Sequence, residues 1–312
     1  HVSMHASQPV YFTSSCQISR DGQKVRLLVV NIFAIWLLTA CSTNPVKDDA
    51  AHDYALTRHG VNSALWLQTS AEYQALSLQV YTAARLTLPE ALADTGWTAI
   101  APPDRKSPTT LPLAVIMDVD ETVLSNARFQ GELIQRGTTF NRELFNDWVH
   151  TTKIPPVPGA LEFVKAAVDL GISIFFVTNR DVSLEPVTRK NLQRLGFPLD
   201  SDADYLLMRN ERPDWTRDKE SRRAFIARNY RVIMIFGDDL NDITSAAKGS
   251  LSDRQAAVAA YSAFWGQRWF ILPNPAYGSW EHALYGFRKD LVSGEKLRLR
   301  MKHLHSNDST TH

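Results

Sequence analysis

Apolar and polar positions follow one another along the chain in blocks that predict alternating strands and helices. Apolar runs of strand length cover residues 111–117, 172–177, 205–208, 231–236 and 269–272. Helical spacing fills the intervals between them, at residues 157–170, 183–195, 219–228 and 242–248. Continuous apolar strands separated by helices are typical of a parallel sheet that is covered on both faces. The pattern therefore predicts an α/β fold with a Rossmann-like parallel sheet flanked by helices.

The segments on either side of the first strand predict a second, smaller group of helices. Residues 63–92 repeat apolar positions at helical spacing. We expect the region from about 59 to 95, with residues 125–156, to form a helical cap on a sheet domain that spans 59–312. The tail from residue 295 is basic and histidine-rich, and a frayed, solvated end is expected there in preference to a metal site.

The N-terminal 40 residues have the parts of a secretory leader. Basic residues precede an apolar run over residues 27–40, which is shorter than the roughly 20 residues that span a bilayer. The run ends in Leu-Thr-Ala-Cys41, which resembles the lipobox of bacterial lipoproteins. This resemblance implies that residues 1–40 are a signal peptide, that Cys41 is lipidated and that the polar residues 41–58 form a tether to the membrane. The alternative is an ordinary cleaved signal in which Cys41 has no role.

The composition suits a folded protein whose ligands are bound by a local site. The chain has 312 residues, 44% of them hydrophobic, and a formal net charge of +1. A near-neutral body offers no electrostatic surface for a nucleic-acid polymer, so an anionic substrate has to be bound locally. The two cysteines, Cys16 and Cys41, cannot form a disulfide framework if the leader is removed and Cys41 is modified.

Polar side chains follow each of the three longest apolar runs, where the strands are expected to end. Residues 118–122 are Asp-Val-Asp-Glu-Thr, residues 178–180 are Thr-Asn-Arg, and residues 237–242 are Gly-Asp-Asp-Leu-Asn-Asp. Ligands of open α/β sheets bind beyond the carboxyl ends of the strands. A carboxylate can attack a dianionic phosphomonoester once a cation neutralises the phosphoryl oxygens, and Mg²⁺ prefers hard oxygen ligands such as those of Asp118 and Asp238. The convergence therefore predicts a phosphate and metal site.

Each motif has a simpler interpretation when it is taken alone. The Asp118 run is similar to the start of an EF-hand loop, but Val123 replaces the turn glycine and Phe129 replaces the bidentate glutamate. Thr178 alone fits a hydroxyl that caps a turn, and Asp242 alone fits a helix N-cap. Their joint occurrence at strand ends favours a chemical role.

The order of these motifs resembles the haloacid dehalogenase (HAD) superfamily of phosphatases. Several blocks further resemble the class C acid phosphatases: residues 65–73, 118–126, 148–149 with 156–160, 177–180 and 272–281. They occur in the family's order across roughly residues 63–282. Members of that family are bacterial outer-membrane lipoproteins, which agrees with Cys41 and with the uncharged Ser42 after it. The resemblance implies a HAD-like fold and a protein of the bacterial cell envelope.

By position, the resemblance also implies roles for the acidic residues. Asp118 is expected to be the nucleophile that forms an aspartyl-phosphate, and Asp120 to protonate the leaving group and then act as a base. Mg²⁺ is expected to be bound by the carboxylates of Asp118 and Asp238 and by the backbone carbonyl of Asp120. Asp242 is expected to orient a metal-bound water or to lie behind the ligands.

The phosphate-binding residues implied by the resemblance are Thr178, its neighbour Asn179, and Lys219. Thr178 is expected to hydrogen-bond the phosphoryl group and Lys219 to neutralise it. The stretch around Lys219 departs from the family pattern because it is rich in arginine, at positions Arg209, Arg212, Arg217, Arg222 and Arg223.

Substrates of this family include nucleoside 5′-monophosphates, nicotinamide mononucleotide and other small phosphomonoesters, whose rings stack on aromatic side chains. The matching positions here are Phe140, Phe145, Trp148 and Tyr277. Phe129 stands where the family often has a tyrosine, so a hydroxyl contact is not expected there. Core packing of an inserted helix is the alternative for Phe140, Phe145 and Trp148.

The sequence thus predicts a Mg²⁺-dependent phosphomonoester hydrolase. Two alternatives remain: a surface lipoprotein that binds a phosphorylated or aromatic ligand without turnover, and a phosphotransferase that uses the same aspartyl-phosphate. The binding protein without turnover is disfavoured by the presence of Asp118, Asp120 and Asp238, because binding alone needs neither a nucleophile nor a proton donor. The sequence leaves the oligomeric state open, with a dimer among the options.

Overall fold

The computed structural model describes residues 45–101, 110–151, 153–199 and 204–304. The chain divides into two compact units, residues 1–48 and 49–312, and the second unit contains the sheet. The expected signal peptide and Cys41 lie outside the described residues. Among the helices that are described, none combines the length and the apolar character needed to cross a membrane.

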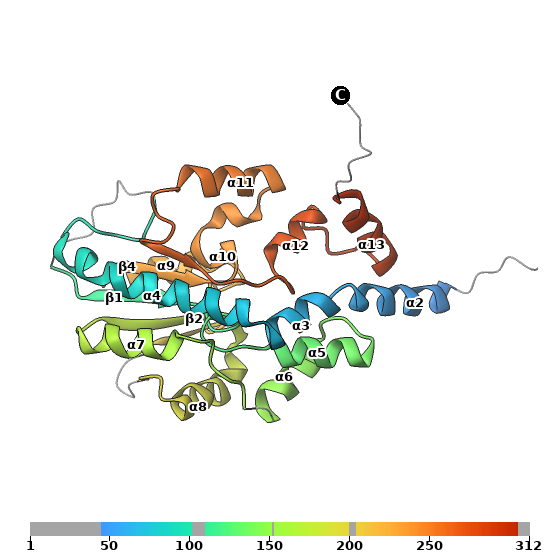
Figure 1. Ribbon diagram of the computed structural model, residues 1–312, viewed down its shortest axis with the longest axis horizontal. Coiled ribbons are helices and arrows are strands. Elements are labelled where there is room, and N and C mark those ends of the chain that lie inside the picture. Colours follow the sequence, from blue (N-terminus) through green and yellow to red (C-terminus); the bar gives the residue numbers. More distant parts are fainter. Residues whose placement is uncertain (1–44, 102–109, 152, 200–203, 305–312) are drawn as a thin grey trace, which may run out of the picture. The chain divides into compact units, whose positions relative to one another are not determined.

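A parallel sheet forms the centre of the second unit (Figure 1), which confirms the predicted α/β fold. Its strands are β1 (Leu113–Met117), β2 (Ser173–Asp181), β3 (Leu206–Arg209), β4 (Arg231–Gly237) and β5 (Trp269–Ile271). Their spatial order is β3-β2-β1-β4-β5. Because β2 and β3 lie on one side of β1 and β4 and β5 on the other, the order reverses between β1 and β4. Such a switch point is where open α/β sheets bind ligands.

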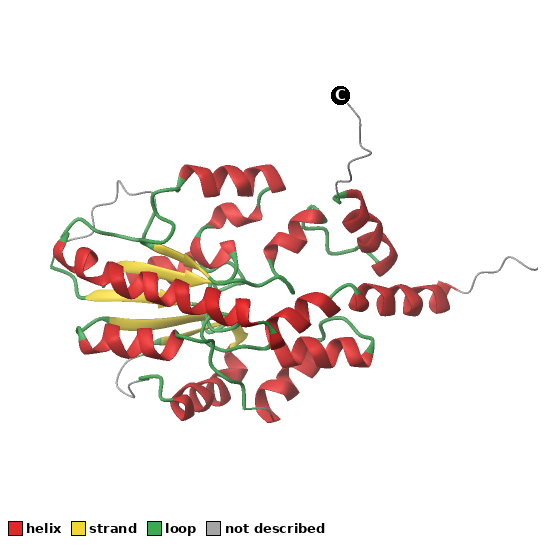
Figure 2. Cartoon of the chain, viewed as in Figure 1, coloured by secondary structure: helices red, strands yellow, loops and turns green. Residues whose placement is uncertain are grey.

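Helices cover both faces of this sheet (Figure 2). The helices that precede and follow β1 are α2 (Pro45–Arg58), α3 (Val61–Thr69), α4 (Ala71–Ala93), α5 (Ala127–Arg136), α6 (Arg142–Thr151) and α7 (Ala160–Asp169). The later ones are η1 (Val182–Leu184), α8 (Glu185–Leu195), α9 (Glu220–Ala227), α10 (Leu240–Ile243), η2 (Ser245–Lys248), α11 (Leu251–Ala260), α12 (Ser279–Leu284) and α13 (Ser293–Lys302).

The side chains of each strand are divided between two separate cores, which explains why the strands are apolar throughout. In β1, Val115 and Met117 belong to the core that includes α4, α7 and α8. Ala114 and Ile116 belong to the opposite core, which includes residues of α9 and α10. Strands that are buried on both faces have no polar face, so their sequences do not alternate.

Helix α4 belongs to the main core and not to the expected cap. Its Tyr81 stacks on Phe236 of β4, with ring centroids 5.5 Å apart, and also lies against Phe163 of α7. The cap expected at 59–95 is therefore wrong for α4. Nearby, α3 and α5 pack together, and Gln68 donates a hydrogen bond to the carbonyl of Ala127 at 2.7 Å.

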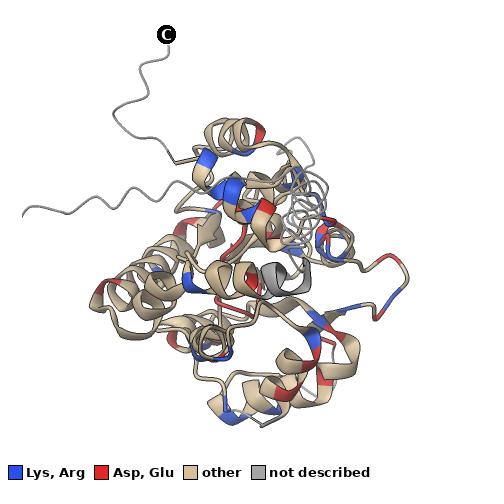
Figure 3. Cartoon of the chain, turned by 90° about the vertical axis from the view of Figure 1, so that its right-hand side faces the viewer, with Lys and Arg blue, Asp and Glu red and all other residues tan. Residues whose placement is uncertain are grey.

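Four described helices lie outside the predicted elements: α2, α11, α12 and α13. Two of them fall in segments expected to be a tether and a frayed end: residues 45–58 form α2, and residues 295–302 of the expected tail belong to α13. Asp53 of α2 accepts a hydrogen bond from Ser293 of α13. Neither segment has a continuous apolar face, so sequence periodicity could not identify them. Basic and acidic positions are interspersed on the described helices of this side of the second unit (Figure 3).

Candidate active site

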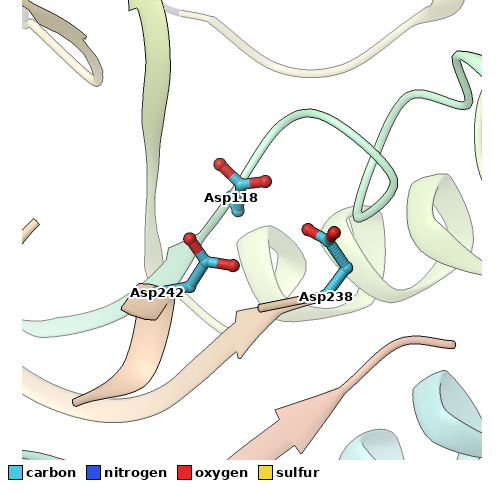
Figure 4. Close-up of side chains that lie close together, drawn as sticks. All are labelled: Asp118, Asp238 and Asp242. Carbon is cyan, nitrogen blue, oxygen red and sulfur yellow. The ribbon is translucent and has the colours of Figure 1, made fainter. Parts of the chain in front are cut away.

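Three carboxylates meet at the switch point of the sheet. Asp118 follows β1, Asp238 follows β4, and Asp242 belongs to α10. One carboxylate oxygen of each lies within 4.8 Å of the others, and Figure 4 shows the three groups turned toward one another. Hard oxygen donors in this number suit Mg²⁺. Asn274 donates to Asp238 at 2.7 Å and so orients one of these ligands.

Lys219 supplies the positive charge beside the predicted nucleophile. It precedes α9, is buried, and its Nζ donates to Asp118 and lies 2.6 Å from Oδ1 of Asp242. The structure thus brings together the lysine and the aspartates that the sequence singled out. Three carboxylates and one ammonium leave two negative charges, which match the charge of one divalent cation.

Burial and mutual repulsion perturb the pKa of each group in this acidic cluster. Burial raises the pKa of Asp118 to about 7, even though Lys219 acts against the shift, and Asp242 adds to it. Burial and the neighbouring carboxylates also raise the pKa values of Asp238 and Asp242. Burial alone would lower the pKa of Lys219, but Asp118 and Asp242 raise it. The cluster therefore holds protons that a divalent cation would displace.

The turn after β4 is shaped to admit Asp242. A Cβ on Gly237 would overlap the side chain of Asp242, so only glycine fits there. Asp239 caps α10 by accepting from the backbone N–H of Asn241 at 2.8 Å, and Oδ2 of Asp242 accepts from the N–H of Asp239 at 3.0 Å. The N-cap is thus Asp239, which corrects the simpler interpretation of Asp242. Asp242 completes the capping box and still faces Lys219 with Oδ1.

Asp120, two residues after Asp118, is held by side chains from other elements. Arg180 of β2 donates through Nε and Nη2, and its shortest contact is 2.7 Å to Oδ1. Asn126 donates to the same oxygen at 2.7 Å, and the Thr178 hydroxyl lies 3.4 Å from Oδ2. Burial would raise the pKa of Asp120, but the charge and hydrogen bonds of Arg180 lower it below its usual range.

The second strand is longer than predicted, so Thr178, Asn179 and Arg180 lie within β2. The side chain of Asn179 donates to the carbonyl of Arg217 at 3.1 Å and accepts from Arg222 at 2.8 Å. These two hydrogen bonds connect the end of β2 to the residues before and within α9. The predicted contact of Asn179 with phosphate stays a prediction. Arg222 is buried and also donates to the carbonyl of Thr178.

Arg223, the next residue of α9, donates to the carbonyls of Asn241 at 3.0 Å and Asp242 at 2.9 Å. Two arginines of the arginine-rich stretch thus connect α9 to the loops that carry the site. Both arginines donate to backbone carbonyls, and the cation in contact with Asp118 is Lys219.

The predicted aromatic residues form a cluster that differs in exposure from one ring to the next. Phe140 is 60% exposed, Phe145 is half-buried, and Trp148 is buried. All three rings surround Phe129, with centroid distances of 6.3, 5.3 and 5.8 Å. Trp148 is therefore part of the core, and the exposed Phe140 is free to make the predicted ligand contact. Tyr277 lies apart from them and donates to Glu121 at 3.2 Å.

Glu121 is a buried residue to which no role was assigned from the sequence. Its φ of 58° lies in the left-handed region, which costs a residue with a side chain free energy. Its carboxylate accepts from the backbone N–H of Asn126 at 2.8 Å, and burial raises its pKa to about 8. The residue ties the Asp118–Thr122 turn to α5.

Sequence reasoning left four further residues without a role: Asn126, Arg180, Arg222 and Asn274. All except Arg222 lie inside the blocks that carry the family resemblance. Local sequence cannot show that Arg180 reaches Asp120, because 60 residues separate them in the chain.

Comparisons with known proteins agree with this geometry. The sequence profile of the HAD superfamily, subfamily IIIB (acid phosphatase), matches residues 36–280. The class C acid phosphatase from Bacillus anthracis is 31% identical, with a TM-score of 0.71 over 81% of this chain and 99% of that chain. A structure of that enzyme with tungstate bound gives a TM-score of 0.72 at the same identity and coverage.

Curated plant proteins match a shorter region. The stem 28 kDa glycoprotein of Glycine max is 26% identical over 167 residues, which are 52% of this chain and 58% of that protein. Acid phosphatase 1 of Solanum lycopersicum is 28% identical over 166 residues, 52% of this chain and 57% of that protein. The chain thus spans little more than half the length of these relatives. With the family profile, the shared fold and the site in agreement, the resemblance seen in the sequence is confirmed, and the chain belongs to the acid phosphatases of HAD subfamily IIIB.

Proposed function

We propose that this chain is a Mg²⁺-dependent acid phosphatase that hydrolyses small phosphomonoesters through an aspartyl-phosphate on Asp118. Nucleoside 5′-monophosphates and nicotinamide mononucleotide are the proposed substrates. The observation that carries the proposal is the position of Asp118, beside Lys219 and the two other carboxylates of the acidic cluster, at the switch point of the sheet.

The residues present fit a divalent cation. The carboxylates of Asp118 and Asp238 and the backbone carbonyl of Asp120 would bind Mg²⁺, with Asp242 behind them. When bound, the cation neutralises phosphoryl oxygens that would otherwise repel a carboxylate nucleophile. The uncompensated charge of the cluster supports this assignment, because two negative charges in a buried site require a counter-ion or protons.

The remaining steps belong to the side chains. The carboxylate of Asp118 attacks phosphorus, and the Lys219 ammonium and the Thr178 hydroxyl bind the phosphoryl oxygens. Asp120 gives a proton to the leaving oxygen and then removes one from the attacking water. Arg180 keeps Asp120 ionised in the free protein. A dianionic substrate beside Asp120 acts in the opposite direction, because a nearby like charge raises the pKa of a carboxyl.

The test of this proposal is phosphate release by the purified protein. AMP and p-nitrophenyl phosphate should be hydrolysed with Mg²⁺ and not with EDTA. Recovery of bound, intact AMP would instead favour a binding protein without turnover. Formation of glycerol phosphate from AMP and glycerol would favour a phosphotransferase.

The aromatic cluster supports a substrate with a planar base. Phe140, the most exposed of its rings, should contribute by stacking, which is worth about 1–3 kcal/mol per base. Phe140→Ala should therefore raise KM for AMP by at least about fivefold and leave KM for glycerol 3-phosphate unchanged. Tyr54→Ala, at an exposed aromatic residue of α2, is the control. Equal changes in KM for AMP and for glycerol 3-phosphate would show that Phe140 does not stack on the base.

We also propose that the protein is anchored to the outer membrane of a bacterial cell envelope by lipid on Cys41. The lipobox-like sequence before Cys41 supports this. Cells that express the protein should incorporate a fatty-acid analogue into it, and Cys41→Ser should abolish that label. Unchanged labelling of the variant would contradict the anchor.

A further inference from the structure

Asn126 occupies an unusual place between the predicted proton donor and the aromatic cluster. It is the N-cap residue of α5 and only 1% exposed. An asparagine at this position normally caps its own helix through the side chain. Here the side chain makes no capping bond. It donates instead to Asp120 at 2.7 Å and accepts from Nε1 of Trp148 at 3.1 Å.

The chemistry of its two partners fixes the orientation of the Asn126 amide. An indole N–H can only donate, so the amide oxygen must face Trp148. An ionised carboxylate can only accept, so the amide NH₂ must face Asp120. The opposite orientation would place two acceptors together and two donors together inside the protein, which is unfavourable for buried groups. Trp148 therefore determines which end of the amide Asp120 meets.

The amide in turn determines which oxygen of Asp120 remains available. Oδ1 takes the two shortest contacts, at 2.7 Å each, from Arg180 and Asn126. Oδ2 takes only longer contacts, at 3.2 Å from Arg180 and 3.4 Å from Thr178. A carboxylate anchored through one oxygen presents the other in a fixed direction, and Oδ2 is the oxygen able to carry a proton to a leaving group.

We propose that Asn126 is a positioning residue for Asp120, and that Trp148 acts through Asn126 and not as a stacking surface for the substrate. The burial of Trp148 and its packing on Phe129 support this second part. The inference rests on the proposed phosphatase function. It adds that helix α6, which carries Trp148, is coupled to proton transfer by a chain of hydrogen bonds.

The experiment uses esters whose leaving groups differ in basicity. AMP releases a basic alkoxide that needs a proton, whereas 2,4-dinitrophenyl phosphate releases a phenolate that leaves without one. General acid catalysis contributes about 10²–10⁴-fold where it is needed, so Asn126→Ala should lower kcat/KM for AMP at least about 30-fold. The same variant should lower kcat/KM for 2,4-dinitrophenyl phosphate by less than about threefold, because kcat/KM covers only the steps up to the aspartyl-phosphate, where this leaving group needs no proton from Asp120.

Trp148→Phe is the second variant, because it keeps an aromatic ring on Phe129 and removes the indole N–H, although the phenyl ring is also smaller than the indole. It should show the same dependence on leaving group with a smaller loss for AMP, about fivefold, as expected for one neutral hydrogen bond. The double variant should be no worse than Asn126→Ala alone, because both changes break one chain. Fully additive losses would overturn the role of Trp148.

Asn191→Ala is the matched control. Asn191 is also buried, and it donates to the carbonyl of Ile154 at 3.1 Å, away from Asp120. Its replacement should leave the ratio of the two activities unchanged. An equal loss on both esters in Asn126→Ala would overturn the positioning role and leave the phosphatase proposal intact. A wild-type protein inactive on every ester would overturn both. If Asn126→Ala does not fold, the ratio measured with Trp148→Phe decides.

Discussion

Two aspartates of a single turn, Asp118 and Asp120, occupy opposite electrostatic environments. Asp118 lies on the side of β4, among carboxylates that Lys219 only partly neutralises, and its pKa is raised to about 7. Asp120 lies on the side of β2, paired with Arg180, and its pKa is lowered. Two titratable groups whose environments move their pKa values apart are typical of divided catalytic roles.

The difference shows how one short motif serves two tasks. In the proposed mechanism Asp118 acts as a ligand and nucleophile only with a cation bound, and its surroundings leave negative charge uncompensated. Asp120 needs a fixed direction, so its surroundings consist of directional donors. The positive φ of Glu121 turns the chain directly after Asp120 and lets neighbouring residues reach different strands.

The largest expected effect comes from Asp118→Asn, which removes the nucleophile. The variant should lose about 10⁴-fold or more in kcat for every ester, as enzymes do when a nucleophile is lost. Phosphate release from AMP and from 2,4-dinitrophenyl phosphate measures this. Asp120→Asn, by contrast, should spare kcat/KM for the second ester, because its aspartyl-phosphate forms without a proton from Asp120. Asp169→Asn, at an exposed end of α7, controls for charge. Comparable losses of activity on 2,4-dinitrophenyl phosphate in Asp118→Asn and Asp120→Asn would contradict the division of roles between the two aspartates.

The next effect tests whether the acidic cluster binds metal. Asp238→Asn removes one negative charge, and the Mg²⁺ concentration for half-maximal activity should rise at least about 100-fold, since even outer-shell changes cost 10–100-fold. Asp120→Asn should raise it far less, because Asp120 contributes only a backbone carbonyl. An Mg²⁺ titration of activity and of melting temperature checks both. An unchanged Mg²⁺ requirement in Asp238→Asn would exclude Asp238 as a ligand.

Sequence patterns predicted the sheet and the aspartates because both depend on local signals. Buried parallel strands are apolar throughout, and the residue after such a strand lies at the ligand-binding edge whatever the rest of the chain does. This is why Asp118 and Asp238 were identified with their strands. Helices α2 and α13 were missed because neither has a continuous apolar face.

The partners of Asp120 could not be predicted for a different reason. Arg180 was visible at the end of an apolar run, but nothing local shows that its guanidinium is buried against Asp120. Arg222 stood in the sequence as one arginine of an arginine-rich stretch, whereas in the structure it is buried and donates to the carbonyls of Thr178 and Thr216. Roles that arise from contacts across 40 or more residues need the three-dimensional fold.

The pH dependence of stability should differ for the two aspartates. Asp118 has an ordinary value of 3.8 and about 7 in the fold, so between these pH values the folded protein holds a proton that the unfolded chain releases. Stability of the metal-free protein should therefore fall as pH rises through that window, by up to about 1.4 kcal/mol per unit for this group. Asp120 acts oppositely: its stabilisation is present above 3.8 and is lost as pH falls through its lowered pKa.

Urea unfolding with EDTA between about pH 4 and pH 7 measures this slope. Saturating Mg²⁺ should flatten it, because the cation replaces the protons. Asp118→Asn should reduce the slope without metal. A metal-free protein that becomes more stable as pH rises through this range would contradict the charge assignment of the cluster.

The smallest effect concerns the ion pair that holds Asp120. Arg180→Lys keeps the charge but loses the planar fork, and should lower the free energy of unfolding by about 1–2 kcal/mol, the scale of charge-assisted hydrogen bonds. Arg189→Lys is a matched control, since Arg189 and Glu185 are also 2.7 Å apart but 26% and 30% exposed, against 0% and 19% for Arg180 and Asp120. Exposed pairs on one helix contribute about 0.3–0.5 kcal/mol, so this variant should stay within that range. Equal losses would mean that burial does not strengthen the Arg180 pair, and the directional hold on Asp120 would then depend on Asn126 alone.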